Sequence, residues 1–170
     1  MGRSRDEFAD FVAADATRLL RIAYLLTGER TAAEALLQDV LERTYVAWPR
    51  IDNPFAYART ALARHAANRW RMRARRPQVS WEDADPPDPR YAGDAERTDD
   101  RDELLRALAE LPDRQRAAVV LRYLEELTEA ETAAALNCSV GTVKSQTSRG
   151  LTKLRVLLDA PHTPASGSPR

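Results

Sequence analysis

The sequence is poor in the residues that cross-link small folds or bind metal ions: it has one cysteine, two histidines and six glycines in 170 residues. A lone cysteine, Cys138, excludes an intramolecular disulfide framework, and so few cysteines and histidines exclude an ordinary zinc site. This cysteine use fits a reduced, cytoplasmic setting. We expect no metal ion and no cofactor.

Long apolar runs are also missing. No stretch approaches the roughly 20 apolar residues of a membrane-spanning helix, and the N-terminus lacks the apolar segment of a signal peptide. We therefore expect a soluble chain. The 26 basic and 26 acidic residues cancel, which argues against a general polyanion binder. The two signs are unevenly distributed along the chain, and their placement is more informative than their sum.

The apolar residues recur at spacings of three and four, and alternating runs of β-branched residues are absent. This periodicity predicts an all-α fold. We expect N-terminal helices over about 5–27, 32–48 and 54–76, followed by a second helical block over about 101–158.

Several helix ends are marked by capping residues. A hydroxyl residue followed three positions later by a glutamate forms a capping box, which satisfies free amide groups at a helix start. This pattern occurs at Ser4–Glu7, Thr31–Glu34 and Thr128–Glu131. Gly28 and Pro49 should end the first two helices.

The stretch from 54 to 76 is strongly basic. It contains seven arginines, no lysine and no acid, with Tyr57 and Trp70 among them. Such a surface repels itself unless a polyanion lies nearby, and the planar guanidinium group is well suited to phosphate. The alternative is an ordinary solvated face, since runs of charge are common on helix surfaces.

The charge then reverses. Residues 77–103 contain ten acids against three arginines, together with four prolines, a composition typical of flexible linkers. We therefore expect two small helical domains, 1–76 and 101–158, joined by an acidic flexible linker at 77–100. The last segment, 159–170, is predicted to be a disordered tail.

The C-terminal block holds two helices separated by a sharp turn. Asn137 tolerates the left-handed backbone that such a turn requires, and Ser139 can cap the next helix. In that helix we expect an inward stripe of Val140, Val143, Thr147, Leu151 and Leu154. Hydrogen-bonding and basic residues should lie on the other side, namely Thr142, Ser145, Ser148, Arg149 and Thr152, with Lys144 at the flank.

A short helix, a tight turn and a second helix form the helix-turn-helix arrangement, whose second helix enters the major groove of DNA. Lysine and arginine suit phosphates or guanine, while serine and threonine reach bases or phosphates. The plain alternative is a helical hairpin with a solvated face. The absence of any acid between Glu131 and Asp159 favours DNA binding.

Two rival functions stay open on the residues alone. A stand-alone regulator with a similar recognition helix would bind its operator unaided, but it leaves the arginine-rich segment unexplained. A metal-dependent nuclease or nucleotide hydrolase would need clustered carboxylates, which the basic helices lack. His65 has no clear partner for general-base catalysis, so we assign no catalytic residue. Cys138 is more typical of a small packing residue than of a redox sensor.

Together these features resemble the extracytoplasmic-function (ECF) class of bacterial RNA polymerase sigma factors, the smallest members of the sigma-70 family, over residues 8–158. "LLRIAYLLTGERTAAEALLQDVLERTYVAW" looks like the core-binding helices of the family's sigma-2 domain. "NPFAYARTALARHAANRWRMRARR" looks like its promoter-opening helix. "LPDRQRAAVVLRYLEELTEAETAAALNCSVGTVKSQTSRGLTKLR" is similar to sigma-4, and "VKSQTSRGL" resembles a variant of actinobacterial members.

The resemblance implies a transcription initiation factor, not an enzyme, that binds core RNA polymerase and directs it to promoters. The sigma-2-like domain would recognise and melt the minus-ten element, and the helix-turn-helix would recognise the minus-thirty-five element. The implied partners are the clamp of the largest polymerase subunit, the flap of the second-largest and promoter DNA. An anti-sigma factor is an additional candidate partner.

The resemblance also implies roles for individual residues. The minus-thirty-five contacts would be Lys144, Ser145, Ser148 and Arg149. The minus-ten contacts would be Asp52, Asn53, His65, Asn68, Arg69 and Arg73. The polymerase contacts would be Gln38, Asp39, Glu42 and Arg43. Ala35 and Gln146 stand where family members often have an acid and a basic residue.

Overall fold

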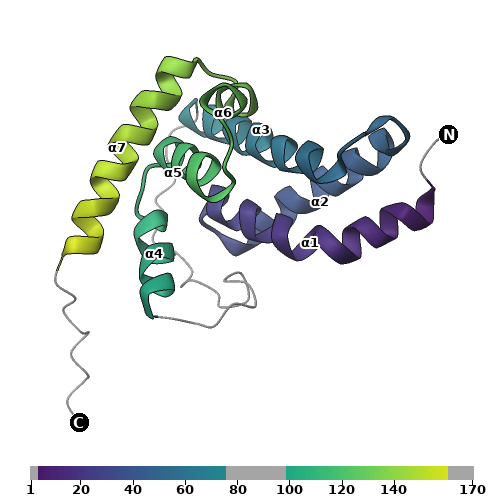
Figure 1. The fold of residues 1–170 in the computed structure, drawn as a ribbon, viewed down its shortest axis with the longest axis horizontal. Coiled ribbons are helices and arrows are strands. Elements are labelled where there is room, and N and C mark those ends of the chain that lie inside the picture. Colours follow the sequence, from purple (N-terminus) through teal and green to yellow (C-terminus); the bar gives the residue numbers. More distant parts are fainter. Residues whose placement is uncertain (1–3, 76–98, 161–170) are drawn as a thin grey trace, which may run out of the picture.

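The computed structural model describes residues 4–75 and 99–160, and within these ranges it contains helices and no strand. The all-α prediction is therefore confirmed. The N-terminal half comprises α1 (Arg5–Thr27), α2 (Arg30–Ala47), the 3-10 turn η1 (Trp48–Arg50) and α3 (Pro54–Ala74). The C-terminal half comprises α4 (Asp99–Ala109), α5 (Asp113–Val119), the π-helical turn η3 (Val120–Leu124), α6 (Glu129–Leu136) and α7 (Val140–Asp159) (Figure 1).

The expected linker and tail fall largely outside the described residues. Of the segment 77–100, only the last two residues are described, and they begin α4. The tail is described as far as residue 160. The division into two domains at these boundaries stays a prediction.

The first helix begins and ends as expected. The Ser4 hydroxyl accepts a hydrogen bond from the Glu7 amide (3.3 Å), and the Glu7 carboxylate accepts one from the Ser4 amide (2.9 Å). At the other end Gly28 adopts φ 72°, and its amide donates to the Tyr24 carbonyl. Glycine is favoured in this left-handed conformation because it has no Cβ.

The predicted capping box at Thr31 and Glu34 is wrong. Helix α2 starts earlier, at Arg30, with Glu29 as its N-cap and no side-chain cap. The Glu34 carboxylate accepts a hydrogen bond from Arg30 Nε at 3.0 Å, so it pairs along the helix instead of reaching back to the backbone. Thr31 consequently lies inside the first turn rather than before it.

The N-terminal half packs three helices around a common core. The largest fully buried side chains of α1, α2 and α3 are those of Leu19, Ile22, Leu26, Leu36, Val40, Thr44 and Leu62. Beside them Trp48 is buried, with its ring 5.1 Å from that of Phe8 in an edge-to-face arrangement. The Trp48 indole N–H donates to the Ser4 carbonyl at 3.0 Å. This bond ties the end of α2 to the start of α1.

The C-terminal half depends on a close crossing of α5 and α7. Gly150 of α7 is buried, and a Cβ at this position would lie 2.7 Å from Val119 Cγ2 and 3.2 Å from the Gln115 carbonyl oxygen. Around the crossing lies a cluster that includes Leu108, Val120 and Leu154. The absence of a side chain at residue 150 therefore sets the spacing of these two helices.

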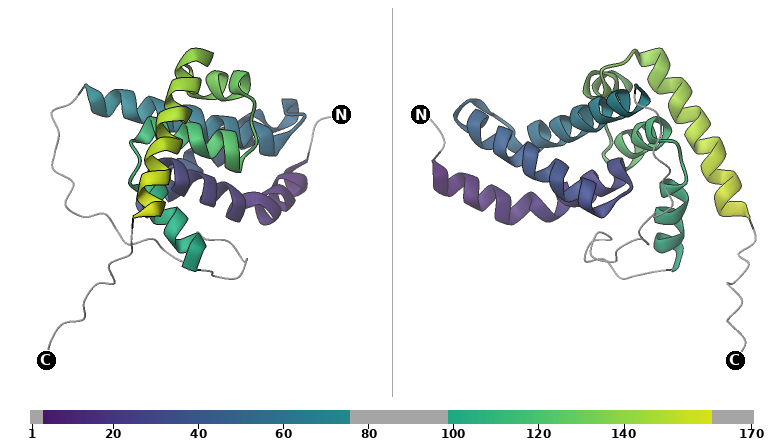
Figure 2. Two further views of the ribbon diagram at one scale, coloured as in Figure 1. Left: turned by 60° about the vertical axis from the view of Figure 1, so that its left-hand side comes forward. Right: turned by 180° about the vertical axis from the view of Figure 1, so that it is seen from behind.

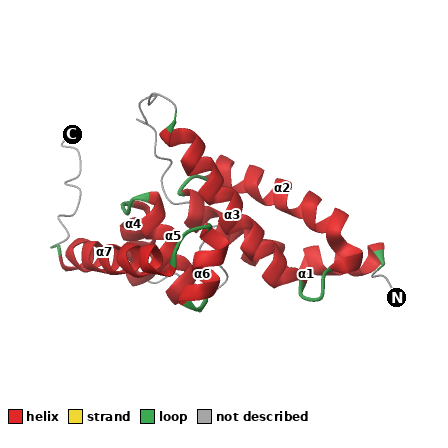
Figure 3. Ribbon diagram, turned by 90° about the horizontal axis from the view of Figure 1, so that it is seen from above, coloured by secondary structure: helices red, strands yellow, loops and turns green. Residues whose placement is uncertain are grey.

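The two halves lie side by side and share one core. In Figure 3 helices α1–α3 occupy one side and α4–α7 the other, and the right-hand view of Figure 2 agrees. The main apolar cluster joins residues of α1, α2 and α3 to five residues of the C-terminal half, Ala117, Leu121, Leu127, Ala135 and Leu136. The described helices are thus packed as one body.

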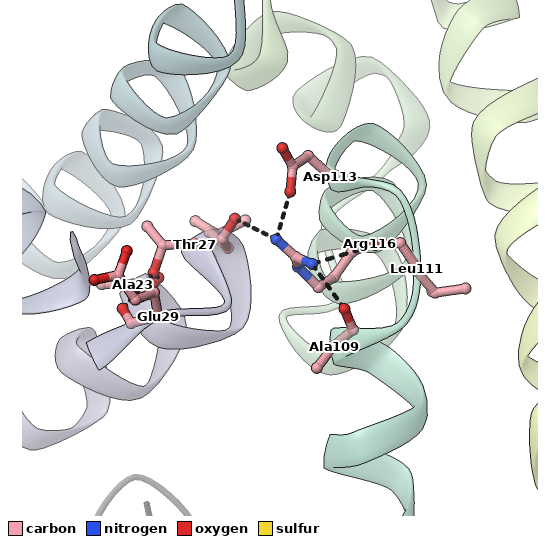
Figure 4. A network of polar contacts seen from close by, with 8 residues as sticks. Ala23, Thr27, Glu29, Ala109, Leu111, Asp113 and Arg116 are labelled. Atoms are coloured by element: carbon pink, nitrogen blue, oxygen red, sulfur yellow. Dashed lines mark hydrogen bonds and ion pairs between the residues drawn. The ribbon is translucent and has the colours of Figure 1, made fainter. Parts of the chain in front are cut away.

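Arg116 of α5 lies where the halves meet and is 4% exposed (Figure 4). Its Nη2 donates to the Leu26 carbonyl of α1 (3.3 Å) and to the Asp113 carboxylate (2.7 Å). Its Nη1 contacts the carbonyls of Ala109 (3.4 Å) and Leu111 (3.2 Å). Burial lowers the pKa of Arg116, and Asp113 opposes that shift. The charge is retained because the buried guanidinium is paired and hydrogen-bonded.

The crossing of α5 and α7 gives a stability test. We expect Gly150→Ala to lower the free energy of unfolding by about 1–3 kcal/mol, because the added methyl group would overlap Val119 and overpack the contact. Chemical denaturation followed by circular dichroism measures the effect.

The matched control is Gly141→Ala in the same helix. A Cβ there would meet only Ser139 Oγ at 3.8 Å, so this variant should be neutral or up to about 1 kcal/mol more stable from its better helix propensity. Equal stability of the two variants would contradict the close crossing.

Candidate nucleic-acid interface

The helix-turn-helix formed by α6 and α7 has three local caps, all predicted from the sequence. The Thr128 hydroxyl accepts from the Glu131 amide (3.1 Å) and the Glu131 carboxylate accepts from the Thr128 amide (2.7 Å). Asn137 adopts φ 52° and ends α6, and the Ser139 hydroxyl accepts from the Thr142 amide at 3.1 Å to start α7. The helix-turn-helix backbone is therefore specified locally.

Helix α7 has a buried side and an exposed side. Val143, Gly150 and Leu154 are buried, and the four predicted minus-thirty-five residues are all exposed, namely Lys144, Ser145, Ser148 and Arg149. Val140 was expected on the inward stripe, but it is 39% exposed. It is the first residue of α7, so its side chain stands at the helix end and has neighbours on one side only.

Two residues of this face have contacts that DNA would have to replace. Lys144 Nζ lies 3.7 Å from Glu129 Oε2 of α6, and both side chains are largely exposed. The Ser145 hydroxyl donates to the Thr142 carbonyl at 3.0 Å. An exposed ion pair of this kind contributes little to stability, so a phosphate can take the place of the Glu129 carboxylate at small cost. Gln146 is half-buried and faces a cleft beside α3 instead.

The polar residues of α3 differ in their exposure to solvent. Arg64 and Arg73 are exposed, as is Asn68, whereas His65 and Arg69 are half-buried. Four members of the candidate minus-ten set lie within about two turns of this one helix, namely His65, Asn68, Arg69 and Arg73.

Arg59 and Arg71 of α3 instead hold the C-terminal half. Arg59 Nη1 lies 3.6 Å from a carboxylate oxygen of Glu125 and donates to the Glu125 carbonyl at 3.3 Å. Arg71 Nη2 donates to the Leu136 carbonyl at 3.1 Å. Part of the basic segment thus has a partner inside the protein, which the sequence interpretation did not foresee.

The residue directly before α3 has a local structural role. The Asn53 side chain accepts a hydrogen bond from the Ala56 amide at 3.0 Å and caps α3, and Pro54 follows at the first helical position. Asp52 and Asn53 are both exposed. Capping fixes the direction in which the chain enters the helix. Asp52 and Asn53 therefore have a defined position at the start of α3.

His65 joins the candidate polymerase residues to the candidate DNA residues. Burial is the main cause that lowers the pKa of His65, Arg43 of α2 adds to the shift, and Asp39 of α2 opposes it. The charges of α2 therefore act directly on α3.

A groove runs between α2 and α1. Its volume is about 600 Å³, and its lining is Phe8, Leu20, Glu34, Leu37, Gln38, Leu41, Glu42 and Tyr45. All four predicted polymerase residues are exposed, and Gln38 and Glu42 lie on the rim of this groove. The aromatic residues of the groove, Phe8 of α1 and Tyr45 of α2, were not among the predicted contacts, although Tyr45 follows the same helical stripe as Gln38 and Glu42.

Three observations on the described residues concern metal binding, membrane crossing and thiol reactivity. Residues 4–75 and 99–160 contain no group of three or more His, Cys, Asp or Glu side chains that could hold a metal ion. Their helices include none long and apolar enough to cross a membrane. Cys138 is half-buried and packs against the core, and burial raises the pKa of its thiol, which disfavours the reactive thiolate.

Known proteins share both sequence and fold with this chain. Residues 101–154 match the family model described as "Sigma-70, region 4". The RNA polymerase sigma-E factor of Streptomyces avermitilis is 37% identical over 157 residues, which cover 91% of this chain and 86% of that protein. The ECF RNA polymerase sigma factor SigW of Bacillus subtilis is 28% identical, with 89% and 88% covered. The sigma factor RpoE in complex with the anti-sigma factor NepR, from Bartonella quintana, has a TM-score of 0.67 at 23% identity, with 92% and 99% covered.

The environment of His65 predicts how it titrates. Nuclear magnetic resonance should give a midpoint below 6.5 for the folded protein; Arg43→Gln should raise it and Asp39→Asn should lower it. The control Arg75→Gln, beyond the end of α3, should leave it unchanged. Since the folded state then binds fewer protons than the unfolded state, the His65 contribution to the free energy of unfolding is lost as pH falls from 6.5 through the folded pKa. A midpoint unaffected by Arg43→Gln would contradict the contact between α2 and α3.

Proposed function

This chain belongs to the extracytoplasmic-function class of RNA polymerase sigma factors, and from that membership we propose which of its surfaces carries out each part of transcription initiation. As a sigma factor it binds core RNA polymerase and directs it to promoters. The helix-turn-helix lies in the segment that matches region 4. The roles of individual residues are our proposal.

Helix α7 reads the minus-thirty-five element in this proposal. The observation that carries it is the outward face of a capped helix with no acid before its last residue, Asp159, on which Lys144, Ser145, Ser148 and Arg149 are all exposed. Arg149 can donate two hydrogen bonds to a guanine, and the two serines can reach bases or phosphates. Lys144 can neutralise a phosphate once it leaves Glu129.

Helices α2 and α3 together bind polymerase and the minus-ten element. Gln38, Asp39, Glu42 and Arg43 present an exposed polar face beside an apolar groove, an arrangement suited to a helical partner. The minus-ten set comes next in the chain: Asp52 and Asn53 precede α3, and four residues lie on it, His65, Asn68, Arg69 and Arg73. Extruding a base costs a few kcal/mol. Coupling between the DNA-binding face and the polymerase-binding face through His65 would allow part of the free energy of polymerase binding to offset that cost.

The proposed role also bears on enzyme activity, location and an additional partner. The chain is not itself an enzyme, because polymerase supplies the chemistry. A cytoplasmic location goes with polymerase and promoter DNA as partners. The structural relative from Bartonella quintana is described in complex with an anti-sigma factor, and we propose that a protein of this kind is also a partner of this chain.

Run-off transcription with core RNA polymerase and a genomic promoter library tests the function. Promoter-specific transcripts that require the chain are expected. No such transcripts, together with no co-purification with core polymerase, would refute it, and tight operator binding without polymerase would point to a stand-alone regulator.

The face of α7 predicts base-specific losses. Arg149→Ala should remove about 1–3 kcal/mol of discrimination at one base pair of the minus-thirty-five element. Lys144→Ala should weaken binding to all sequences. It should also reduce the slope of the logarithm of the binding constant against the logarithm of salt concentration by about 1, the value for one phosphate contact. Promoter binding by holoenzyme, measured on single-base variants, separates the two effects. Arg155→Ala, an exposed arginine of the same helix outside the proposed face, should change neither quantity.

The polar face of α2 predicts a loss of polymerase affinity. Asp39→Arg combined with Glu42→Arg should weaken binding to core polymerase by at least about tenfold, because charge reversal opposes a complementary surface. Fluorescence anisotropy of the labelled chain measures this affinity. The control Asp10→Arg reverses an exposed acid on α1. Equal affinities of variant and control would remove α2 from the polymerase interface.

A further inference from the structure

The outer face of α3 carries an exposed apolar side chain among arginines. Met72 is 62% exposed, whereas Trp70, two residues earlier, is buried. Arg73 and Arg75 follow Met72 closely in the chain and are exposed as well. The whole helix contains no acidic residue. Apolar surface framed by positive charge suits a ligand that is anionic outside and apolar within, as duplex DNA is.

Met72 continues the row of candidate minus-ten residues. His65, Asn68 and Met72 are spaced three and four positions apart, so they lie on the same face of the helix. Arg75 stands three positions further on, and it is exposed like Asn68. The face assigned to the minus-ten element therefore extends without interruption to the end of α3, beyond the residues proposed above to bind it.

Met72 lies far from the residues that precede α3. It comes 19 positions after Asn53, which is about 28 Å along a helix at about 1.5 Å per residue. About eight base-pair steps of a duplex span that length at about 3.4 Å per step. A DNA base beside Asn53 is therefore out of the reach of Met72, which must face a different part of the promoter.

The order of the helices indicates which part that is. The next described element after α3 is α4, which begins the C-terminal half, and the proposed function assigns the minus-thirty-five element to that half. We therefore place the Met72 end of α3 on the side of the minus-ten element that faces the minus-thirty-five element.

Methionine has the chemistry of a wedge between bases. Proteins that distort DNA through its minor groove insert apolar side chains, methionine among them, between base pairs and partly unstack them. The methionine side chain is unbranched and polarisable, so it adapts to a narrow gap between flat rings. Arginines beside it can neutralise the phosphates on either side of that gap.

We propose that Met72 is such a wedge: it inserts into the promoter duplex at the edge of the minus-ten element nearer the minus-thirty-five element and unstacks one base step there. Arg75 holds an adjacent phosphate. Unstacking one step weakens the neighbouring base pairs, so melting of the minus-ten element starts against a duplex that is already distorted. The inference rests on the proposed role of α3 and adds a residue that acts on stacking, not on base identity.

Open-complex formation on two templates tests the wedge. The full chain is assembled with core RNA polymerase on a promoter identified by run-off transcription. One template is a complete duplex, and the other carries a mismatched, already unpaired minus-ten element. Met72→Ala should slow open-complex formation on the duplex about five- to tenfold, because unstacking loses its apolar compensation, and should change the rate on the unpaired template less than about twofold.

Matched variants separate a wedge from a general loss of contact. Met72→Leu keeps an apolar side chain of similar volume and should retain most of the wild-type rate. Met72→Gln has a similar length but is polar, so it should behave like Met72→Ala. The control Val156→Ala removes an apolar side chain of α7 that is 66% exposed, and it should leave the ratio of the two rates unchanged.

The fluorescent base 2-aminopurine locates the unstacked step, since its emission rises when neighbouring bases no longer stack on it. It is placed directly beside the minus-ten element, on one side or the other. With wild-type holoenzyme the emission should rise on the side toward the minus-thirty-five element. With Met72→Ala holoenzyme that rise should be lost.

The outcomes are separable from those of the proposed function. Equal slowing by Met72→Ala on both templates would overturn the inference, as would a wild-type rate for Met72→Gln or unstacking only on the far side of the minus-ten element. These results would leave the proposed function intact. Failure of the wild-type chain to support promoter-specific transcription, even from the unpaired template, would instead refute the proposed function.

Discussion

The guanidinium group of Arg116 holds together helix ends that would otherwise stop inside the protein with unsatisfied carbonyls. The last carbonyls of a helix have no partner within it, and leaving them buried and unpaired is costly. Arg116 donates to Leu26 at the end of α1, to Ala109 at the end of α4 and to Leu111 after α4. A Cβ on Gly28 would lie 3.3 Å from Arg116 Nη2, so the same glycine that ends α1 also leaves room for the group that caps it. Both halves depend on this one side chain.

The sequence predicted what is local and missed what is distant. The capping boxes at Ser4 and Thr128 and the turn at Asn137 formed as expected, because each involves residues a few positions apart. The box at Thr31 failed because α2 starts one residue earlier, so Thr31 lies inside the first turn, and Glu34 pairs with Arg30. Arg116 and Leu26 are 90 positions apart, and no pattern in the sequence pairs them.

The same limit applies to the functional surfaces. Helical periodicity correctly placed the outer face of α7, since that face is decided by the spacing of its own apolar residues. Composition alone could not tell which arginines of α3 pair inside the protein and which face solvent. Arg59 and Arg71 differ from the others only in lying opposite the C-terminal half. Glu125 and Glu126 are adjacent and identical, yet only the first is buried. The turn η3, which decides this, has no recognised sequence signal.

Apolar packing crosses the boundary between the two halves. The larger cluster joins α1–α3 to residues such as Leu121 and Leu136, and the cluster around Leu154 includes Leu25 of α1. Charged side chains lie on the same boundary, since Arg59 Nη1 is 3.6 Å from a carboxylate oxygen of Glu125. Exposing buried apolar surface to water is unfavourable, whereas separated charges are solvated well. The relative position of the two halves therefore rests mainly on the apolar contacts, and the ion pairs contribute less to it.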